Sequence, residues 1–176
     1  RFTTVSKPHL RKNNPVRVLV PLPLEDNLSS HLCNEARKLA SQSNEKLVLR
    51  FKLHPASSPE HKDKLKSDGN QDVSEFWTMR TFHEELEEAD AVIGSWTSAL
   101  LEAAASGFAV GILQAPDGLY HNPIPDGAAK GRQILLDFLG SFDLLLKVSK
   151  ERASSPNLKK HLDILEQPTR SAALEL

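Results

Sequence analysis

Short apolar runs alternate with amphipathic segments from Val16 onward, and this alternation constrains the fold more than any other feature of the sequence. Val16–Leu22 is rich in β-branched and apolar residues, as expected of a strand buried on both faces. Residues 30–42 carry apolar side chains at helical spacing, which predicts an amphipathic helix. The same alternation predicts strands at Lys46–Leu53, Val73–Trp77, Ala91–Gly94 and Phe108–Leu113, and helices at Thr81–Ala89 and Ser98–Ser106. Strands separated by helices form right-handed βαβ units, so the sequence predicts an α/β fold with a Rossmann-like parallel sheet and helices on both faces.

The ends of the chain and its last third follow a less regular pattern. Residues 114–127 are rich in proline and glycine, which predicts a long loop of the kind that often carries function. Beyond it, Arg132–Leu139 favours a helix, Phe142–Val148 a strand, and Ser155-Pro156 the start of a last helix. We therefore expect a tail or interdomain linker at 1–15, one Rossmann-like domain at 16–150, and a C-terminal helix and tail at 151–176.

Charge and residue types exclude several classes of function. The net charge of −1 argues against a protein that binds nucleic acid by neutralising many phosphates, because such a protein needs a basic surface. Cys33 is the only cysteine, so an intrachain disulfide is excluded and a cysteine-based zinc site is implausible. No apolar stretch approaches the roughly 20 residues of a transmembrane helix. We expect no metal and no transmembrane segment. We expect a cytoplasmic location, either free or peripheral at the inner face of the membrane.

Cationic side chains gather at the end of the second predicted strand. Side chains alternate along a strand, so Arg50, Lys52 and His54 share one face. Three such groups are costly to bury without an anion. Pro55 ends the strand and leaves His54 at its tip, where the imidazole can donate a hydrogen bond to a phosphate or protonate a departing one. The alternative is an edge strand in water, with His54 capping a turn.

A second polar junction follows the predicted strand Ala91–Gly94. Ser95, Thr97 and Ser98 lie in a small turn that leads directly into a helix, so hydroxyls, free backbone N–H groups and the positive helix end meet at one spot. Such a spot suits a phosphate. Glu102 lies one helical turn beyond Ser98 and can hold ribose hydroxyls. The alternative is that the hydroxyls are simple helix caps and Glu102 is solvated.

Both junctions fall at the carboxyl end of the predicted sheet, where parallel α/β sheets bind their ligands. Residues 88–110 resemble the recurrent segment of the C-terminal, donor-binding half of GT-B-type glycosyltransferases. In that segment an AD-x-x-I strand meets a Ser/Thr/Gly turn, an E-A-x-x-x-G helix and a short P-V strand. Here these features correspond to Ala89-Asp90, the turn Gly94–Ser98, Glu102 and Gly107, while Phe108-Ala109 departs from the usual proline.

The dipeptide His54-Pro55 narrows the resemblance. It is similar to the HP element of bacterial sialyltransferases, capsule Kdo transferases and CDP-glycerol glycerophosphotransferases, which use cytidine nucleotides. The resemblance implies that His54 is catalytic and meets the donor phosphate. It also implies that Thr97 and Ser98 bind phosphate and that Glu102 binds ribose. From their positions at the two strand ends, Lys52 and Ser95 are expected to bind the same substrate. The expected ligands are a CMP- or UDP-linked nucleotide-sugar as substrate, with no cofactor, and a glycan acceptor.

The catalytic base of those families is an acidic residue of the N-terminal domain. The pair Glu25-Asp26 is the only acidic pair at a predicted strand end that we consider for the role of catalytic base, and its position also fits the start of a helix. We therefore expect a donor-binding domain of a glycosyltransferase in bacterial surface-polysaccharide synthesis, whose partner is an N-terminal Rossmann-like half if this chain is a fragment. A nucleotide-sugar epimerase or hydrolase of the same fold and a non-catalytic interaction module are the alternatives. His31, His61 and His83 are predicted to be solvated. His121, in the long loop, is within the sequence range that could approach a base or sugar, although a loop histidine without a functional role is the favoured interpretation.

Overall fold

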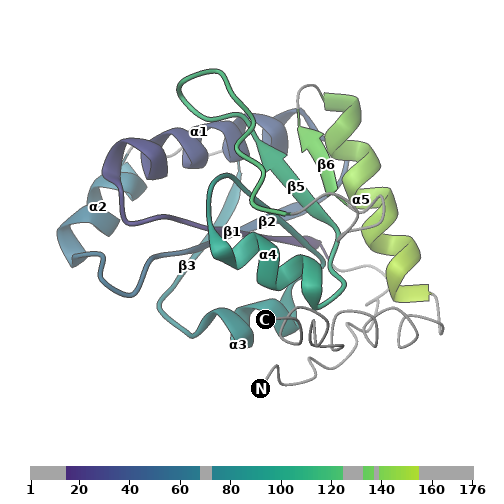
Figure 1. Cartoon of the computed structure of the whole chain (residues 1–176), viewed down its shortest axis with the longest axis horizontal. Helices are drawn as coiled ribbons and strands as arrows, with labels where there is room; N and C mark the ends of the chain where they lie inside the picture. The colour runs from purple at the N-terminus through teal and green to yellow at the C-terminus, as the bar shows by residue number, and fades with distance from the viewer. Residues whose placement is uncertain (1–14, 68–72, 125–132, 137–138, 155–176) are drawn as a thin grey trace, which may run out of the picture.

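A computed structural model describes residues 15–67, 73–124, 133–136 and 139–154, and it shows a parallel sheet flanked by helices (Figure 1). The described strands are β1 (Val16–Pro21), β2 (Leu47–Lys52), β3 (Ser74–Thr78), β4 (Ala91–Gly94), β5 (Val110–Leu113) and β6 (Gln133–Leu136). The described helices are α1 (Asp26–Gln42), α2 (Pro59–Ser67), α3 (Phe82–Glu88), α4 (Ser98–Ala105) and α5 (Leu139–Ser154). All pairs of neighbouring strands are parallel, in the order β3-β2-β1-β4-β5-β6. The expected α/β, Rossmann-like fold is confirmed.

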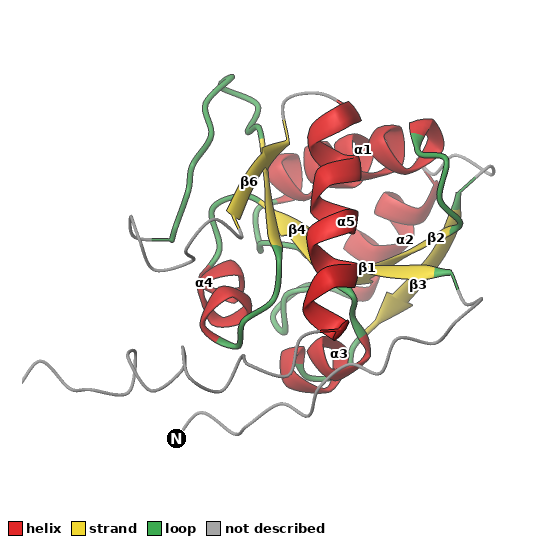
Figure 2. Cartoon of the chain, turned by 90° about the vertical axis from the view of Figure 1, so that its right-hand side faces the viewer, coloured by secondary structure: helices red, strands yellow, loops and turns green. Residues whose placement is uncertain are grey.

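Helices cover both faces of the sheet, because each strand of its centre is apolar on both sides (Figures 1 and 2). On one face α1, α2 and α5 pack against alternate residues of the strands, such as Val18, Phe51 and Ile93. On the other face α3 and α4 pack against the intervening residues, such as Leu19 and Val92. The side of the sheet on which a residue lies therefore decides which helices it meets.

Two elements differ from the prediction. The helix expected at Arg132–Leu139 is wrong, because Gln133–Leu136 forms β6 and pairs with β5. The strand expected at Phe142–Val148 is also wrong, because these residues lie within α5. Phe142, Leu145 and Leu146 are buried at helical spacing, while the unbroken apolar run Leu144–Leu146 hides that period in the sequence.

Close packing at β5 explains how β6 and α5 fit against the sheet. A Cβ added to Gly111 would lie 2.6 Å from Leu136 of β6 and 2.9 Å from Leu145 of α5. The missing side chain at Gly111 therefore lets α5 approach the sheet directly over β5. α5 continues to Ser154, beyond residue 150, and the helix expected from Ser155 lies outside the described residues. Among the described helices, none has the length and apolar character needed to cross a membrane.

Candidate functional site

The strand order creates a switch point between β1 and β4. From β1 the chain builds outward through β2 to β3, and from β4 it builds the opposite way through β5 to β6. The connections on the two sides of β1 and β4 therefore diverge and leave a crevice at their carboxyl ends, which is where open α/β sheets bind ligands. Both polar junctions predicted from the sequence end on this edge of the sheet.

The turn after β4 carries a buried hydroxyl without a partner. Ser95 is 1% exposed, and its Oγ has no hydrogen-bond partner among the described residues. Thr97 is the N-cap of α4 and its Oγ1 accepts the N–H of Ala99 at 3.3 Å. Ser98 is the exposed first residue of that helix. The prediction that these hydroxyls gather at a helix N-terminus is confirmed, and capping accounts for Thr97 but not for Ser95.

Glu102 lies on α4, one turn after Ser98, and is partly exposed. Its Oε1 lies 3.5 Å from Nδ1 of His83 on α3. His83 was expected to be solvated, and its side chain is 32% exposed. Glu102 therefore stands at the junction of the two helices that cover this face, with its carboxylate still open to a ligand.

Lys52 ends β2 as a buried cation. The residue is 6% exposed, and its Nζ donates to the carbonyl of Leu53 at 2.6 Å. Burial lowers the pKa of Lys52, and the charge of Glu85 acts against that shift. No ion pair joins Lys52 to a carboxylate within the described part of the chain. The ammonium group is therefore a buried charge that an anionic ligand would compensate.

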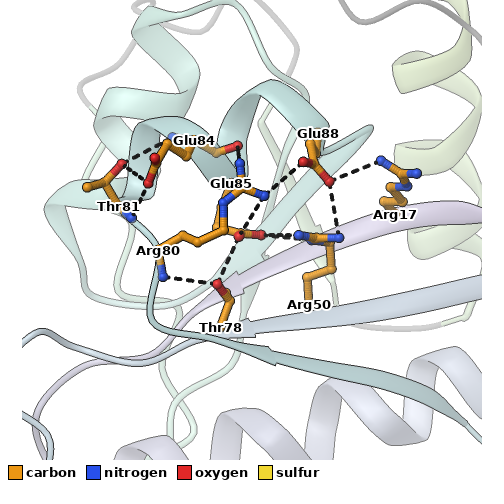
Figure 3. A network of polar contacts seen from close by, with 8 residues as sticks. All are labelled: Arg17, Arg50, Thr78, Arg80, Thr81, Glu84, Glu85 and Glu88. Carbon is orange, nitrogen blue, oxygen red and sulfur yellow. Dashed lines mark hydrogen bonds and ion pairs between the residues drawn. The ribbon is translucent and has the colours of Figure 1, made fainter.

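Arg50, two residues earlier, has its anion within the protein (Figure 3). Its Nε and Nη2 donate to Oε2 of Glu85 on α3 at 2.8 and 2.6 Å, and Glu85 is completely buried. Thr78 donates to Oε1 of the same carboxylate at 2.8 Å. Arg50 therefore has the anion that its burial requires, but this anion is a carboxylate of α3 and not a ligand.

His54 is exposed, two residues beyond the end of β2. Its Nδ1 accepts the N–H of Ala56 at 3.2 Å, so in the neutral ring the proton is on Nε2. A ring in this tautomer can donate one hydrogen bond to a phosphate oxygen. β1 lies between β2 and β4, so the strands that carry His54 and the Ser95–Ser98 turn are about 10 Å apart, which is two strand spacings.

The loop after β5 reaches the same edge. Trp96 is 66% exposed and meets the ring of His121 edge to face, with 5.4 Å between the ring centroids. Nε2 of His121 lies 2.6 Å from Oδ2 of Asp117. The pKa of Asp117 is lowered by the Leu119 N–H and by His121. His121 thus lies beside the β4 turn, while the exposed Trp96, which sequence reasoning did not single out, adds an aromatic surface there.

Of the histidines that were expected to be solvated, His61 is buried, while His31 is partly exposed and in contact with the backbone. His61 is 8% exposed and lines a pocket of about 280 Å³ between the β1–α1 and β2–α2 connections. Nε2 of His31 lies 2.8 Å from the carbonyl oxygen of Gln114, which ties α1 to the loop after β5. A charged stretch such as His61-Lys62-Asp63-Lys64 gives no sign of burial in the sequence, since burial here depends on the packing of α2 against α1.

Among known proteins, similarity to this chain is found at the level of the fold. No protein-family model matches the sequence, and no curated protein matches it. Among solved structures, TarM covers 97% of this chain with 36% of its own length, at a TM-score of 0.57 and 17% identity. MurG of Acinetobacter baumannii (TM-score 0.47, 13% identity, 80% of this chain and 42% of its own) and WaaG, a glycosyltransferase involved in lipopolysaccharide biosynthesis (0.42, 16%, 89% and 48%), are less similar.

The chain spans well under half of TarM and of MurG, and just under half of WaaG. At such low identity, the likeness to TarM shows the fold alone, which is a Rossmann-like α/β fold.

Proposed function

We propose that this chain is the nucleotide-sugar donor-binding domain of a glycosyltransferase. The observation that carries the proposal is the pair of polar groups at the switch-point edge: the buried Ser95 hydroxyl, which has no partner among the described residues, and the buried Lys52 ammonium, which has a hydrogen bond to Leu53 but no carboxylate partner in the described part of the chain. Lys52 lies on the α3/α4 face of the sheet, as its strand neighbour Arg50 does, and Ser95 leads into α4. An anion at the N-terminus of α4 would satisfy both groups and meet the positive end of the helix.

Each of these residues is assigned to a different part of the nucleotide-sugar donor. Ser95, Thr97 and Ser98 bind a donor phosphate, Lys52 neutralises phosphate charge, and Glu102 holds the ribose hydroxyls. His54 donates Nε2–H to the phosphate that leaves the sugar. A ligand as long as a nucleoside diphosphate can span the two strand spacings between His54 and the α4 turn. Stabilising the charge on the leaving group favours displacement at the anomeric carbon.

We extend the proposal to the substrate class. The resemblance of His54-Pro55 to the HP element supports a CMP- or UDP-linked donor, with cytidine preferred, and a role in bacterial surface-polysaccharide synthesis. The acceptor is a glycan, and the catalytic base comes from a separate N-terminal half. The chain alone then binds the donor without turning it over.

The proposal is tested by thermal unfolding of the full chain with CMP, CDP, UMP and UDP. A ligand that binds only the folded state stabilises it, so at least one of these nucleotides should raise the melting temperature. His54→Ala should abolish most of that rise, because it removes the Nε2 donor at an exposed position. Ser41→Ala, a change at the far end of α1, serves as the matched control and should leave the rise unchanged.

The proposal fails if no nucleotide at millimolar concentration raises the melting temperature. It also fails if His54→Ala and Ser41→Ala respond equally to every nucleotide. A second assay separates the enzyme classes, since a hydrolase or epimerase of this fold would release free sugar or an epimer from UDP-N-acetylglucosamine without an acceptor. A donor-binding domain should release neither.

A further inference from the structure

A pocket of about 280 Å³ lies on the α1/α2 side of the same edge, away from the α4 turn. Leu24 and Asp26 approach it from the β1–α1 connection, and Ser57, Glu60, His61 and Lys64 approach it from the β2–α2 connection and α2. Its volume is at the lower end of the range for small-molecule sites, so it suits a group about the size of one monosaccharide. None of the residues assigned to the donor lines it.

Two side chains at this pocket have unsatisfied polar atoms. His61 is more than nine-tenths buried, and neither of its ring nitrogens has a hydrogen-bond partner among the described residues. Nδ1 of His61 lies 3.0 Å from Oδ1 of Asp26, but the two groups are not aligned for a hydrogen bond. The buried Oγ of Ser57 also has no partner in the described part of the chain. Buried polar atoms in native proteins nearly always have partners, so this cluster points to a ligand.

The charges around the pocket do not suit an anion. Asp26 and Glu60 are both carboxylates on its lining, which also carries the cation Lys64. The N-terminus of α2 is already occupied by a carboxylate, because the pKa of Glu60 is lowered by its own backbone N–H and by the hydroxyl of Ser58. A phosphate here would face two like charges, and the helix end would offer it little.

A metal ion does not suit the pocket either. The described residues contain no group of three or more His, Cys, Asp or Glu side chains placed to hold a metal. What remains is a lining that both donates and accepts hydrogen bonds, beside the apolar surface of Leu24, which is 52% exposed. Hydroxyl groups donate and accept at once, so a neutral polyol with one apolar face matches this lining.

From this combination we propose that the pocket binds a sugar residue, held by Ser57, His61 and Lys64, with Asp26 and Glu60 as acceptors. The Asp26 carboxylate is 61% exposed, so its oxygens are open to a ligand hydroxyl beside the His61 ring. The pocket shares a turn with His54, since Ser57 N–H donates to the His54 carbonyl at 2.9 Å. As the acceptor site of a transferase, a role that rests on the proposed function, the pocket would place a glycan hydroxyl close to His54.

The test is a ¹⁵N NMR titration of the full chain with D-glucose, N-acetyl-D-glucosamine, glycerol and inorganic phosphate. Sugar–protein affinities of tens of millimolar are within reach of this measurement. We expect at least one of the sugars to shift the amides of Ser57, His61 and Lys64 and the ring signals of His61, with phosphate leaving them unchanged. His61→Phe keeps a ring of similar volume, and Lys64→Met keeps the stem. Each should weaken sugar binding at least fivefold, while Lys66→Met on the same helix serves as control.

The outcomes separate this proposal from the donor site. No shift with any sugar, a shift with phosphate instead, or equal binding by Lys64→Met and Lys66→Met would overturn the sugar pocket. The donor proposal is tested separately: if nucleotide still raises the melting temperature of the His61→Phe variant, the donor site stands even where the sugar pocket fails. Conversely, if sugar binds and no nucleotide does, the sugar pocket is supported but its role as an acceptor site is overturned.

Discussion

At the carboxyl edge of the sheet, two residues bury polar groups that lack full hydrogen bonding or charge compensation within the described protein. Ser95 hides a hydroxyl that nothing in the described structure satisfies, and Lys52 keeps an ammonium group out of water. Such groups lower the stability of the free protein, because each loses its hydrogen bonds to water without full replacement. Binding sites often retain groups of this kind for a ligand, at some expense in stability.

Ser95→Ala should therefore stabilise the free chain and weaken nucleotide binding at the same time. Removing an unsatisfied buried hydroxyl should add on the order of 1 kcal/mol to the free energy of unfolding, since that is the typical penalty of such a group. Urea unfolding with and without UDP measures both effects, and Ser41→Ala is the control for the substitution itself. A Ser95→Ala variant that is less stable and binds UDP normally would show that the hydroxyl has a structural partner.

At the scale of elements, α3 is fixed to the sheet by ion pairs rather than by apolar contact alone. Arg50 of β2 meets both Glu85 and Glu88 of α3, while Arg17 of β1 and Arg80 also meet Glu88 (Figure 3). The start of α3 was predictable from the sequence, because Thr81 and Glu84 form a capping box three residues apart. The ion pairs were not, because Arg50 and Glu85 are 35 residues apart and meet only in the fold.

The Glu85→Gln variant should lower the free energy of unfolding by about 3–5 kcal/mol, as expected when one partner of a buried ion pair is removed. Glu87→Gln, an exposed position on the same helix, should change it little. The double variant Arg50→Met/Glu85→Leu should be more stable than Glu85→Gln, because no buried charge is left unpaired. Urea unfolding of the three variants decides this, and similar losses for Glu85→Gln and Glu87→Gln would contradict it.

The same cluster should make stability depend on pH. The Arg80 hydrogen bond is the main cause that holds the pKa of Glu88 below its ordinary value; burial acts against it, and the charges of Arg50, Arg80 and Arg17 lower the pKa further. A carboxyl with a lowered pKa in the folded state stabilises the protein above its unfolded pKa, and the contribution is lost as the pH falls through the folded value. Urea unfolding between about pH 5 and pH 3 should show this loss in the wild type, and Glu88→Gln should reduce it. An unchanged pH dependence in that variant would argue against the ion pairs.

For the molecule as a whole, the sequence predicts the parallel sheet, and the six-strand order then places the two junctions on one edge. The strands β1, β2, β4 and β5 and the turn before α4 were predictable because their apolar runs and caps are local features. The last part of the domain was not predictable. Leu144–Leu146 resembles a strand, and its helical state depends on packing against Gly111 and β6. The burial of His61 also depends on how α2 packs, so no local pattern announces the pocket.

The central claim is that a cytidine or uridine nucleotide binds at the edge between β1 and β4. The most direct measurement is a map of backbone amide shifts in the full chain on titration with CDP and UDP. We expect the largest shifts at Ser95–Ala99 and around His54, and we expect Lys52→Met to weaken them. Shifts centred on the opposite ends of the strands, or on the pocket at His61 alone, would contradict it.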